Sequence, residues 1–176
     1  MVSISTVCCA TWARRSRPAS PSRYALRTLD LGVDRGPFHA FLDETFGDPS
    51  LYTEALPTDG AAYGVAALRA AGWRIVGITA RPSHLADVTV SWLHSNGLGL
   101  DDVHHTALGT KAEVARRLGV RATVEDNPEE AELLAAVCES WLLDRPYNRH
   151  DPLRRARRVR SWDDAVGRLC QLELFA

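Results

Sequence analysis

The chain has 176 residues, of which 45% are hydrophobic and 24% charged, and its formal net charge at pH 7 is −1. This is the composition of an ordinary globular domain, long enough to bury a sizeable core. The balanced charge argues against a general nucleic-acid binder, and the chain has no run of about 18 apolar residues that could form a membrane-spanning helix. The four cysteines have no spacing typical of a zinc site or a disulfide framework, so we expect a reducing, cytoplasmic setting.

The N-terminal part of the chain differs in composition from the rest. Residues 1–27 are rich in serine, arginine, proline and alanine and show neither helical nor alternating periodicity. We therefore expect 1–27 to be irregular and outside the fold, and 28–176 to form one domain. Pro37–Phe46 has the apolar spacing of a helix that ends at Gly47-Asp48-Pro49, and the region 36–59 is expected to form a small cap.

After the cap, short apolar runs alternate with segments of helical spacing. The expected strands are Trp73–Thr79, Val103–Leu108, Ala122–Val124 and Trp141–Leu143. The expected helices are Ala61–Ala71, Ser83–Asn96, one that opens at a Thr110–Glu113 capping box and ends at Gly119, one from Pro128 to about Ala136, and Ser161–Leu172. This alternation predicts a three-layer α/β fold of the Rossmann-like class, with a parallel sheet covered by helices on both faces.

Three segments carry polar side chains where ligands bind in such sheets, outside the carboxyl ends of the strands. Thr79-Ala80-Arg81 offers a hydroxyl, backbone N–H groups and a guanidinium to an anion. Lys111, the only lysine in the chain, stands in the first turn of a helix, where the helix dipole disfavours a cation unless an anion is near. Glu125-Asp126 is an acidic pair that suits Mg²⁺.

Each of these segments also has an ordinary structural interpretation. The first fits a turn or helix cap, Lys111 fits a solvated surface lysine, and the acidic pair fits a helix N-terminus, where acids are common. A basic run before the last helix is interpreted either as a solvated loop or as the surface of a binding module with an acidic partner. That run comprises Arg154, Arg155, Arg157, Arg158 and Arg160.

Taken in order, five segments resemble the haloacid dehalogenase (HAD) superfamily of phosphotransferases, and within it the 5′(3′)-deoxyribonucleotidase, or type C 5′-nucleotidase, family. They are Ile75–Pro82, Thr110–Val120, Val124–Glu129, Leu142–Arg149 and Val159–Val166. The resemblance extends from about Phe38 to the C-terminus and implies a HAD fold and a Mg²⁺-dependent phosphomonoesterase acting on nucleoside monophosphates or similar small phosphate esters.

The resemblance also implies roles for the strand-end residues. Thr79, with Ala80 and Arg81, would bind the transferring phosphoryl group, and Lys111 would neutralise its charge. Glu125 and Asp126 would hold Mg²⁺. These roles fit the chemistry, because positioning and electrostatic stabilisation dominate phosphoryl transfer. The segment Leu142–Arg149 is characteristic of the family, and we assign it no catalytic role.

The family's first motif, a strand ending in Asp-x-Asp-Gly that supplies the nucleophile and the general acid–base, has no counterpart in the chain. The nearest segment is Leu29–Asp34, in which Asp30 is a candidate nucleophile and Gly32 stands in place of the second aspartate. A plain Asp-Leu-Gly turn is the alternative. A catalytically dead HAD-like protein, which binds a nucleotide or phosphate without turnover, is therefore the second functional interpretation.

A reading-frame error offers another explanation for the missing motif. If the codons of Ser3–Ala13 are read one nucleotide earlier, with third bases left free, they permit Leu-Asp-Leu-Asp-Gly-Val-Leu-Cys-Asp-Leu-Gly, which contains the entire motif. We hypothesise that the natural gene encodes an intact phosphatase and that this chain begins in the wrong frame. The sequence carries no signature of an oligomeric state.

Overall fold

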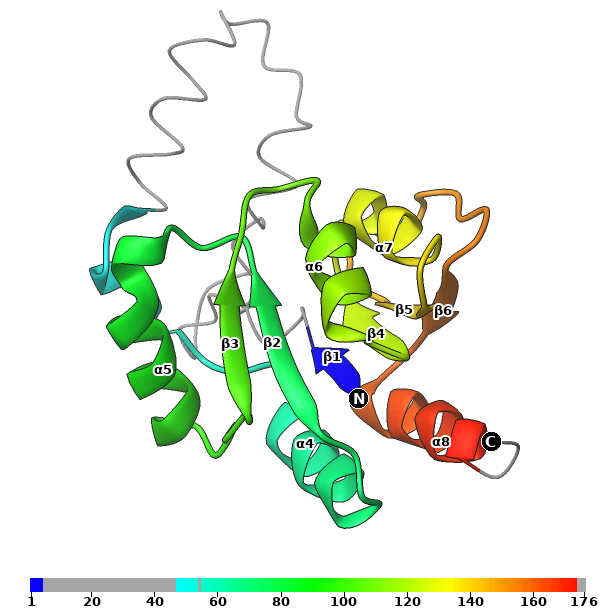
Figure 1. Ribbon diagram of the computed structural model, residues 1–176, viewed down its shortest axis with the longest axis horizontal. Coiled ribbons are helices and arrows are strands. Elements are labelled where there is room, and N and C mark those ends of the chain that lie inside the picture. Colours follow the sequence, from blue (N-terminus) through cyan, green and yellow to red (C-terminus); the bar gives the residue numbers. More distant parts are fainter. Residues whose placement is uncertain (5–46, 54, 174–176) are drawn as a thin grey trace, which may run out of the picture.

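The computed structural model describes residues 1–4, 47–53 and 55–173, and in this part of the chain six strands form one sheet (Figure 1). The strands are β1 (Val2–Ile4), β2 (Ile75–Thr79), β3 (Asp102–His105), β4 (Ala122–Glu125), β5 (Glu139–Leu143) and β6 (Arg157–Val159). Their order is β3-β2-β1-β4-β5-β6, and every neighbouring pair is parallel. The predicted α/β class is confirmed.

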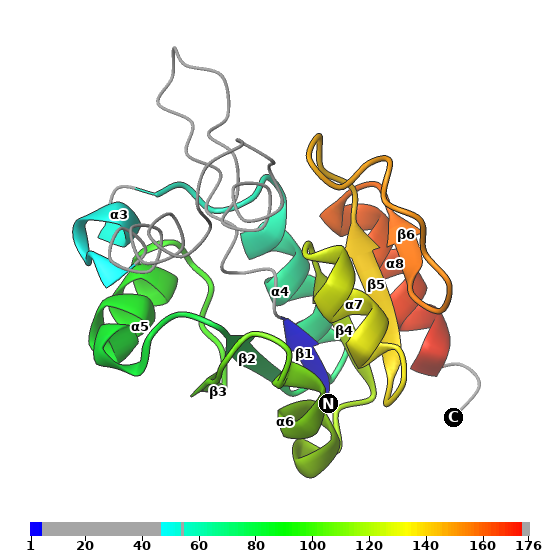
Figure 2. The same cartoon turned by 90° about the horizontal axis from the view of Figure 1, so that it is seen from above.

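Helices cover both faces of this sheet. They are α3 (Ser50–Thr53), α4 (Ala61–Ala70), α5 (Ala86–Ser95), α6 (Lys111–Leu118), α7 (Pro128–Leu134) and α8 (Trp162–Glu173), and the 3₁₀ turn η2 (Ser83–Leu85) leads into α5. Helices α4 and α8 pack together on one face, and α6 and α7 lie on the other (Figure 2). None of these helices has the length and apolar character needed to cross a bilayer.

The two faces have separate cores, which explains why every residue of β2 and of β4 is buried, with no alternation between buried and exposed positions. In β2, Ile75 packs with α4 and α8, whereas Val76 and Ile78 pack with α6. Helices α4 and α8 pack tightly against each other at Gly64 and Trp162. A Cβ on Gly64 would lie only 2.6 Å from Cε3 of Trp162, so the absence of a side chain at this position allows the two helices to meet.

The expectation that residues 1–27 lie outside the fold is wrong for Val2–Ile4. These residues form β1, which pairs in parallel with β2 on one side and β4 on the other. Three residues are too short for a periodicity signal, and the neighbouring strands determine their conformation. Residues 5–46 lie outside the described part of the chain, and with them the expected helix Pro37–Phe46, Asp30 and most of the cap at 36–59.

Two further expectations need correction. The basic run is not a solvated loop throughout, because Arg157–Val159 forms the edge strand β6 beside β5. The Thr110 side chain does not cap α6. Its hydroxyl donates to the carbonyl of Ala107 at 2.8 Å and lies 2.6 Å from the hydroxyl of Thr106. These hydrogen bonds within the loop replace the bond to the helix N-terminus that a capping box would have.

Candidate functional site

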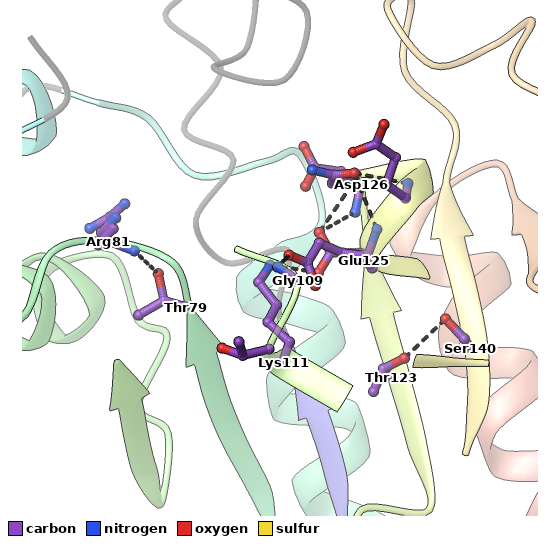
Figure 3. A network of polar contacts seen from close by, with 12 residues as sticks. Thr79, Arg81, Gly109, Lys111, Thr123, Glu125, Asp126 and Ser140 are labelled. Atoms are coloured by element: carbon purple, nitrogen blue, oxygen red, sulfur yellow. Dashed lines mark hydrogen bonds and ion pairs between the residues drawn. The ribbon is translucent and has the colours of Figure 1, made fainter. Parts of the chain in front are cut away.

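The carboxyl ends of β2, β1 and β4 lie side by side, since Ile4 pairs with both Gly77 and Val124. Thr79 ends β2 and Glu125 ends β4, on either side of the central strand. Figure 3 shows Lys111, from the start of α6, between these two residues. The structure therefore brings three of the predicted site residues to one edge of the sheet.

Lys111 and Glu125 form a buried ion pair. Nζ of Lys111 lies 2.8 Å from Oε2 of Glu125, and the two side chains are 6% and 1% exposed. The other carboxylate oxygen of Glu125, Oε1, accepts hydrogen bonds from the backbone N–H groups of Asp126 and Asn127 at 3.0 and 3.1 Å. Lys111 is therefore not the solvated surface lysine of the alternative interpretation, and its ammonium is fixed at the strand ends.

The net effect on Glu125 is a pKa below its usual range. Burial alone would raise the pKa of this carboxyl, but the Lys111 charge and hydrogen bond outweigh it, with help from the hydrogen bonds of Asp126 and Asn127. Glu125 is thus a carboxylate at neutral pH. An ammonium held this way is a preorganised positive group for an anionic ligand.

Glu130, on α7, is a second buried acid near Lys111 that the sequence analysis missed. Its Oε1 accepts a hydrogen bond from the backbone N–H of Gly109, in the loop that leads into α6, and its Oε2 has no hydrogen-bond partner. Burial raises the pKa of this carboxyl, and the Lys111 charge opposes the rise without cancelling it. Glu130 therefore connects α7 to the loop that presents Lys111.

Asp126 is held from the loop after β5. The phenol of Tyr147 donates to Oδ2 of Asp126, and Nδ2 of Asn148 donates to the backbone oxygen of Asp126 at 2.7 Å. The sequence analysis gave this segment no role. Its position directly after a strand, at the same edge of the sheet as the acidic pair, is the feature of the sequence that could have indicated this contact.

Thr79 and Arg81 form the turn that the structural interpretation anticipated. The hydroxyl of Thr79 accepts a hydrogen bond from the backbone N–H of Arg81 at 3.1 Å, and Thr79 is buried. The guanidinium of Arg81 lies 4.1 Å from the ring centroid of Tyr52 and 5.3 Å from that of Trp92. In Figure 3 it stands on the side of Thr79 away from Lys111, so the structure does not bring the two cationic groups together.

Both oxygens of Glu125 are engaged by Lys111 and by backbone N–H groups, and Oδ2 of Asp126 accepts a hydrogen bond from Tyr147, so we take Asp126 as the candidate Mg²⁺ ligand of the acidic pair. The described residues contain no cluster of three or more histidine, cysteine or acidic side chains arranged for a metal. Mg²⁺ does not require one, because it keeps several waters and takes one or two carboxylates together with substrate phosphate. The carboxylate of Asp126 at the strand ends fits that requirement.

No family model matches the sequence. The chain is 24% identical over 147 residues to "Putative nucleotidase BH1399" of Halalkalibacterium halodurans, an alignment that covers 78% of this chain and 70% of the relative.

Several solved structures share the fold of this chain. A HAD family hydrolase from Deinococcus radiodurans, with bound phosphate and sodium, has a TM-score of 0.54 and 19% identity over 79% of this chain and 69% of its own. A dehalogenase has a TM-score of 0.53 and 16% identity, and the match covers 78% of this chain but only 65% of the dehalogenase, less than two thirds of its length. The chain shares the Rossmann-like fold of these solved structures.

Proposed function

We propose that this chain has the catalytic framework of a Mg²⁺-dependent phosphomonoesterase of the 5′(3′)-deoxyribonucleotidase type, which acts in the cytoplasm on nucleoside monophosphates or similar small phosphate esters. The observation that carries the proposal is the buried ammonium of Lys111, which Glu125 fixes at the carboxyl end of β4 and which lies between Glu125 and Thr79 in Figure 3. A buried cation at the carboxyl ends of parallel strands is placed to bind an anionic group. The nucleotidase name of the bacterial relative and the phosphate bound by the Deinococcus hydrolase support the same ligand class.

In this proposal each residue has a distinct task. The hydroxyl of Thr79 and the backbone N–H of Ala80 bind phosphoryl oxygens, while Lys111 neutralises their charge. Glu125 orients Lys111, and Asp126 is the metal ligand. The metal, when bound, supplies charge stabilisation for the phosphoryl oxygens.

A second candidate function is phosphate or nucleotide binding without turnover. One observation favours it: the first acidic residue in the sequence is Asp30, so no aspartate directly follows β1, which ends at Ile4. Without a nucleophile the charged framework can still bind a phosphate, but it cannot form a phosphoaspartate.

The proposal is tested by measuring phosphate binding and hydrolysis with the same set of variants. Calorimetry with inorganic phosphate and hydrolysis of deoxynucleoside monophosphates, each with Mg²⁺ or EDTA, are compared for the wild type, Lys111→Met, Thr79→Val and Asp126→Asn. Arg117→Met is the control, because Arg117 is an exposed cation on the same helix.

We expect Lys111→Met and Thr79→Val to weaken phosphate binding, and to reduce any hydrolysis by about 10²–10³-fold, the effect of losing one stabilising group. Arg117→Met should change neither. Binding without hydrolysis in the wild type selects the second candidate. A wild-type protein that binds no phosphate, or binding that Lys111→Met leaves intact in a folded protein, contradicts both.

A further inference from the structure

Arg81 is a buried cation whose hydrogen-bonding capacity is largely unused. Its side chain is among the buried polar groups, with the residue only 5% exposed. Nη1 makes a long hydrogen bond of 3.4 Å to the hydroxyl of Thr89, whereas Nε and Nη2 are fully buried and have no hydrogen-bond partner. Among the described residues, no carboxylate forms an ion pair with this guanidinium.

The conformation of Arg81 is fixed from several directions. Its backbone N–H donates to Thr79 at 3.1 Å, and its carbonyl oxygen lies 3.0 Å from Nδ1 of His105. Tyr52 and Trp92 provide ring contacts to the guanidinium, and the indole N–H of Trp92 donates to the carbonyl of Ala55 at 2.7 Å. The guanidinium is therefore held in place without depending on its two unused N–H groups.

Those two N–H groups lie on the same edge of the planar guanidinium. Nε and Nη2 donate in parallel, at a spacing that matches two oxygens of one carboxylate or phosphate group. Leaving charged donors buried and unpaired is unfavourable, and such groups in a folded protein call for a specific partner. The aromatic rings offset part of the cost of burying the charge, but they accept no hydrogen bond in the plane of the guanidinium.

We propose that the Nε/Nη2 edge of Arg81 binds an oxyanion, and that this anion is a second anionic group of the substrate. Arg81 follows β2 at the ligand-binding edge of the sheet, yet it lies on the other side of Thr79 from Lys111 (Figure 3). It thus binds a group other than the phosphoryl group that Lys111 would hold. The part of the inference that concerns the substrate rests on the proposed function, whereas the oxyanion site itself does not.

Nuclear magnetic resonance tests the oxyanion site directly, because a buried Nε–H gives an observable signal. The Nε–H resonances of ¹⁵N-labelled protein are followed during titration with inorganic phosphate and, separately, with acetate. Arg81→Lys keeps the charge, removes the two-donor edge and assigns the signal. Arg121→Lys is the control for ring stacking without the buried edge, since Arg121 also stacks on a tryptophan, Trp73, at 5.3 Å, but is exposed and stands before β4 at the opposite edge of the sheet.

We expect a saturable shift of the Arg81 signal with either anion, the same shift in Lys111→Met, and none at Arg121. No saturable shift at Arg81, or an equal shift at Arg121, overturns the oxyanion site. If Arg81→Lys does not fold, the titration of the wild type still tests the oxyanion site, and the Arg81 Nε–H signal is then assigned by through-bond correlation spectra. If Lys111→Met loses phosphate binding but the Arg81 signal of the wild type does not shift, the proposed function stands and this inference fails.

A second comparison separates a substrate group from a free anion. Calorimetry compares 2′-deoxyadenosine 5′-monophosphate with 2′-deoxyadenosine 3′,5′-bisphosphate, which share base and sugar. We expect the bisphosphate to bind at least tenfold more tightly to the wild type and to lose that advantage in Arg81→Lys but not in Arg121→Lys. Equal binding of the two nucleotides, or an advantage that survives Arg81→Lys, overturns the assignment to the substrate.

Discussion

The side chain of Asn148 connects the ends of β4 and β5, and its replacement should destabilise the whole domain. Asn148 is fully buried. Its Nδ2 donates to the carbonyls of Asp126 and Leu143, at 2.7 and 3.0 Å. Its Oδ1 accepts from the backbone N–H of Arg145 at 2.9 Å and from Nη1 of Arg158 at 3.0 Å. All four hydrogen-bonding positions of the amide are thus used.

Asn148→Ala removes these four bonds and leaves three backbone groups without a partner, while Arg158 keeps its ion pair with Asp144. Each buried group left unsatisfied costs about 1–3 kcal/mol. With some replacement by water, the expected loss in the free energy of unfolding is about 3–5 kcal/mol. Asn148→Asp preserves shape and both acceptors, but it places a carboxylate oxygen against two carbonyl oxygens.

The pH dependence of Asn148→Asp distinguishes this account from simple loss of packing. The introduced carboxyl should have a raised pKa in the folded state, because only its protonated form can donate to a carbonyl. Its stability deficit should then be smallest at acid pH and grow as the pH rises through that pKa.

Urea denaturation, followed by tryptophan fluorescence between pH 4 and 8, measures these effects. Asn96→Asp is the control, because Asn96 is partly buried and its amide makes one hydrogen bond, to the carbonyl of Trp92 at 2.8 Å. We expect a cost of about 1 kcal/mol there. A loss below about 1 kcal/mol for Asn148→Ala, or equal losses at the two asparagines, would refute the reasoning.

Three further predictions follow from other buried groups. Gly64→Ala should destabilise the domain by about 1–3 kcal/mol, because the new methyl group would overlap Trp162. The control Gly167→Ala, in α8, meets no atom within 4 Å and should stabilise the domain by up to about 1 kcal/mol. Thermal unfolding measures both changes. Burial raises the pKa of Glu130, so the wild type loses stability as this carboxyl ionises, and Glu130→Gln should be the more stable protein above that pKa and no more stable at acid pH, as measured by urea denaturation. Burial also raises the pKa of Cys138 to about 11, so peptide-resolved mass spectrometry should find this thiol unmodified by iodoacetamide at pH 8 in the folded protein and modified in urea; equal modification in both would count against the prediction.

The parts of the fold that the sequence predicts are those with a local signal. The apolar run before Thr79, the left-handed Gly119 after α6 and Pro128 in the first turn of α7 each identify an element from its own residues. Strands β1 and β6 have three residues each, and tertiary pairing determines both. In β6, Arg158 bonds to the carbonyls of Asn148 and Asp151, contacts that no periodicity in an arginine-rich run reveals.

The candidate site shows the same division. Thr79, Lys111 and Glu125 could be identified because residue type and position after a strand or at a helix start are local properties. The ion pair between Glu125 and Lys111 is a contact across 14 positions in the sequence, and no local pattern reveals it. Because this pair occupies Glu125, the proposal takes Asp126 as the metal ligand. Glu130 and Tyr147 are typical surface residue types, and only the packing of α7 and of the loop after β5 brings them to the site.

The end of β1 determines whether this framework can hydrolyse a phosphate ester, and the reading-frame hypothesis makes a specific prediction there. Replacing residues 3–13 by Leu-Asp-Leu-Asp-Gly-Val-Leu-Cys-Asp-Leu-Gly includes Ile4→Asp and Thr6→Asp. Ile4 is the last residue of the central strand, paired with Gly77 and Val124, so an acid there lies between the strands that end in Thr79 and Glu125. The replacement should introduce Mg²⁺-dependent hydrolysis of deoxynucleoside monophosphates.

The expected gain is about a thousandfold or more over the unmodified chain, since loss of a nucleophile removes at least that much of the rate. The control has the same replacement with asparagine at position 4, which keeps the shape of the strand end but has no nucleophilic carboxylate. If both proteins fold and have equal activity, the motif does not function at this strand, and the binding-only function is favoured. If only the aspartate form is active, Thr79, Lys111 and Asp126 were already in place for a nucleophile that this chain lacks.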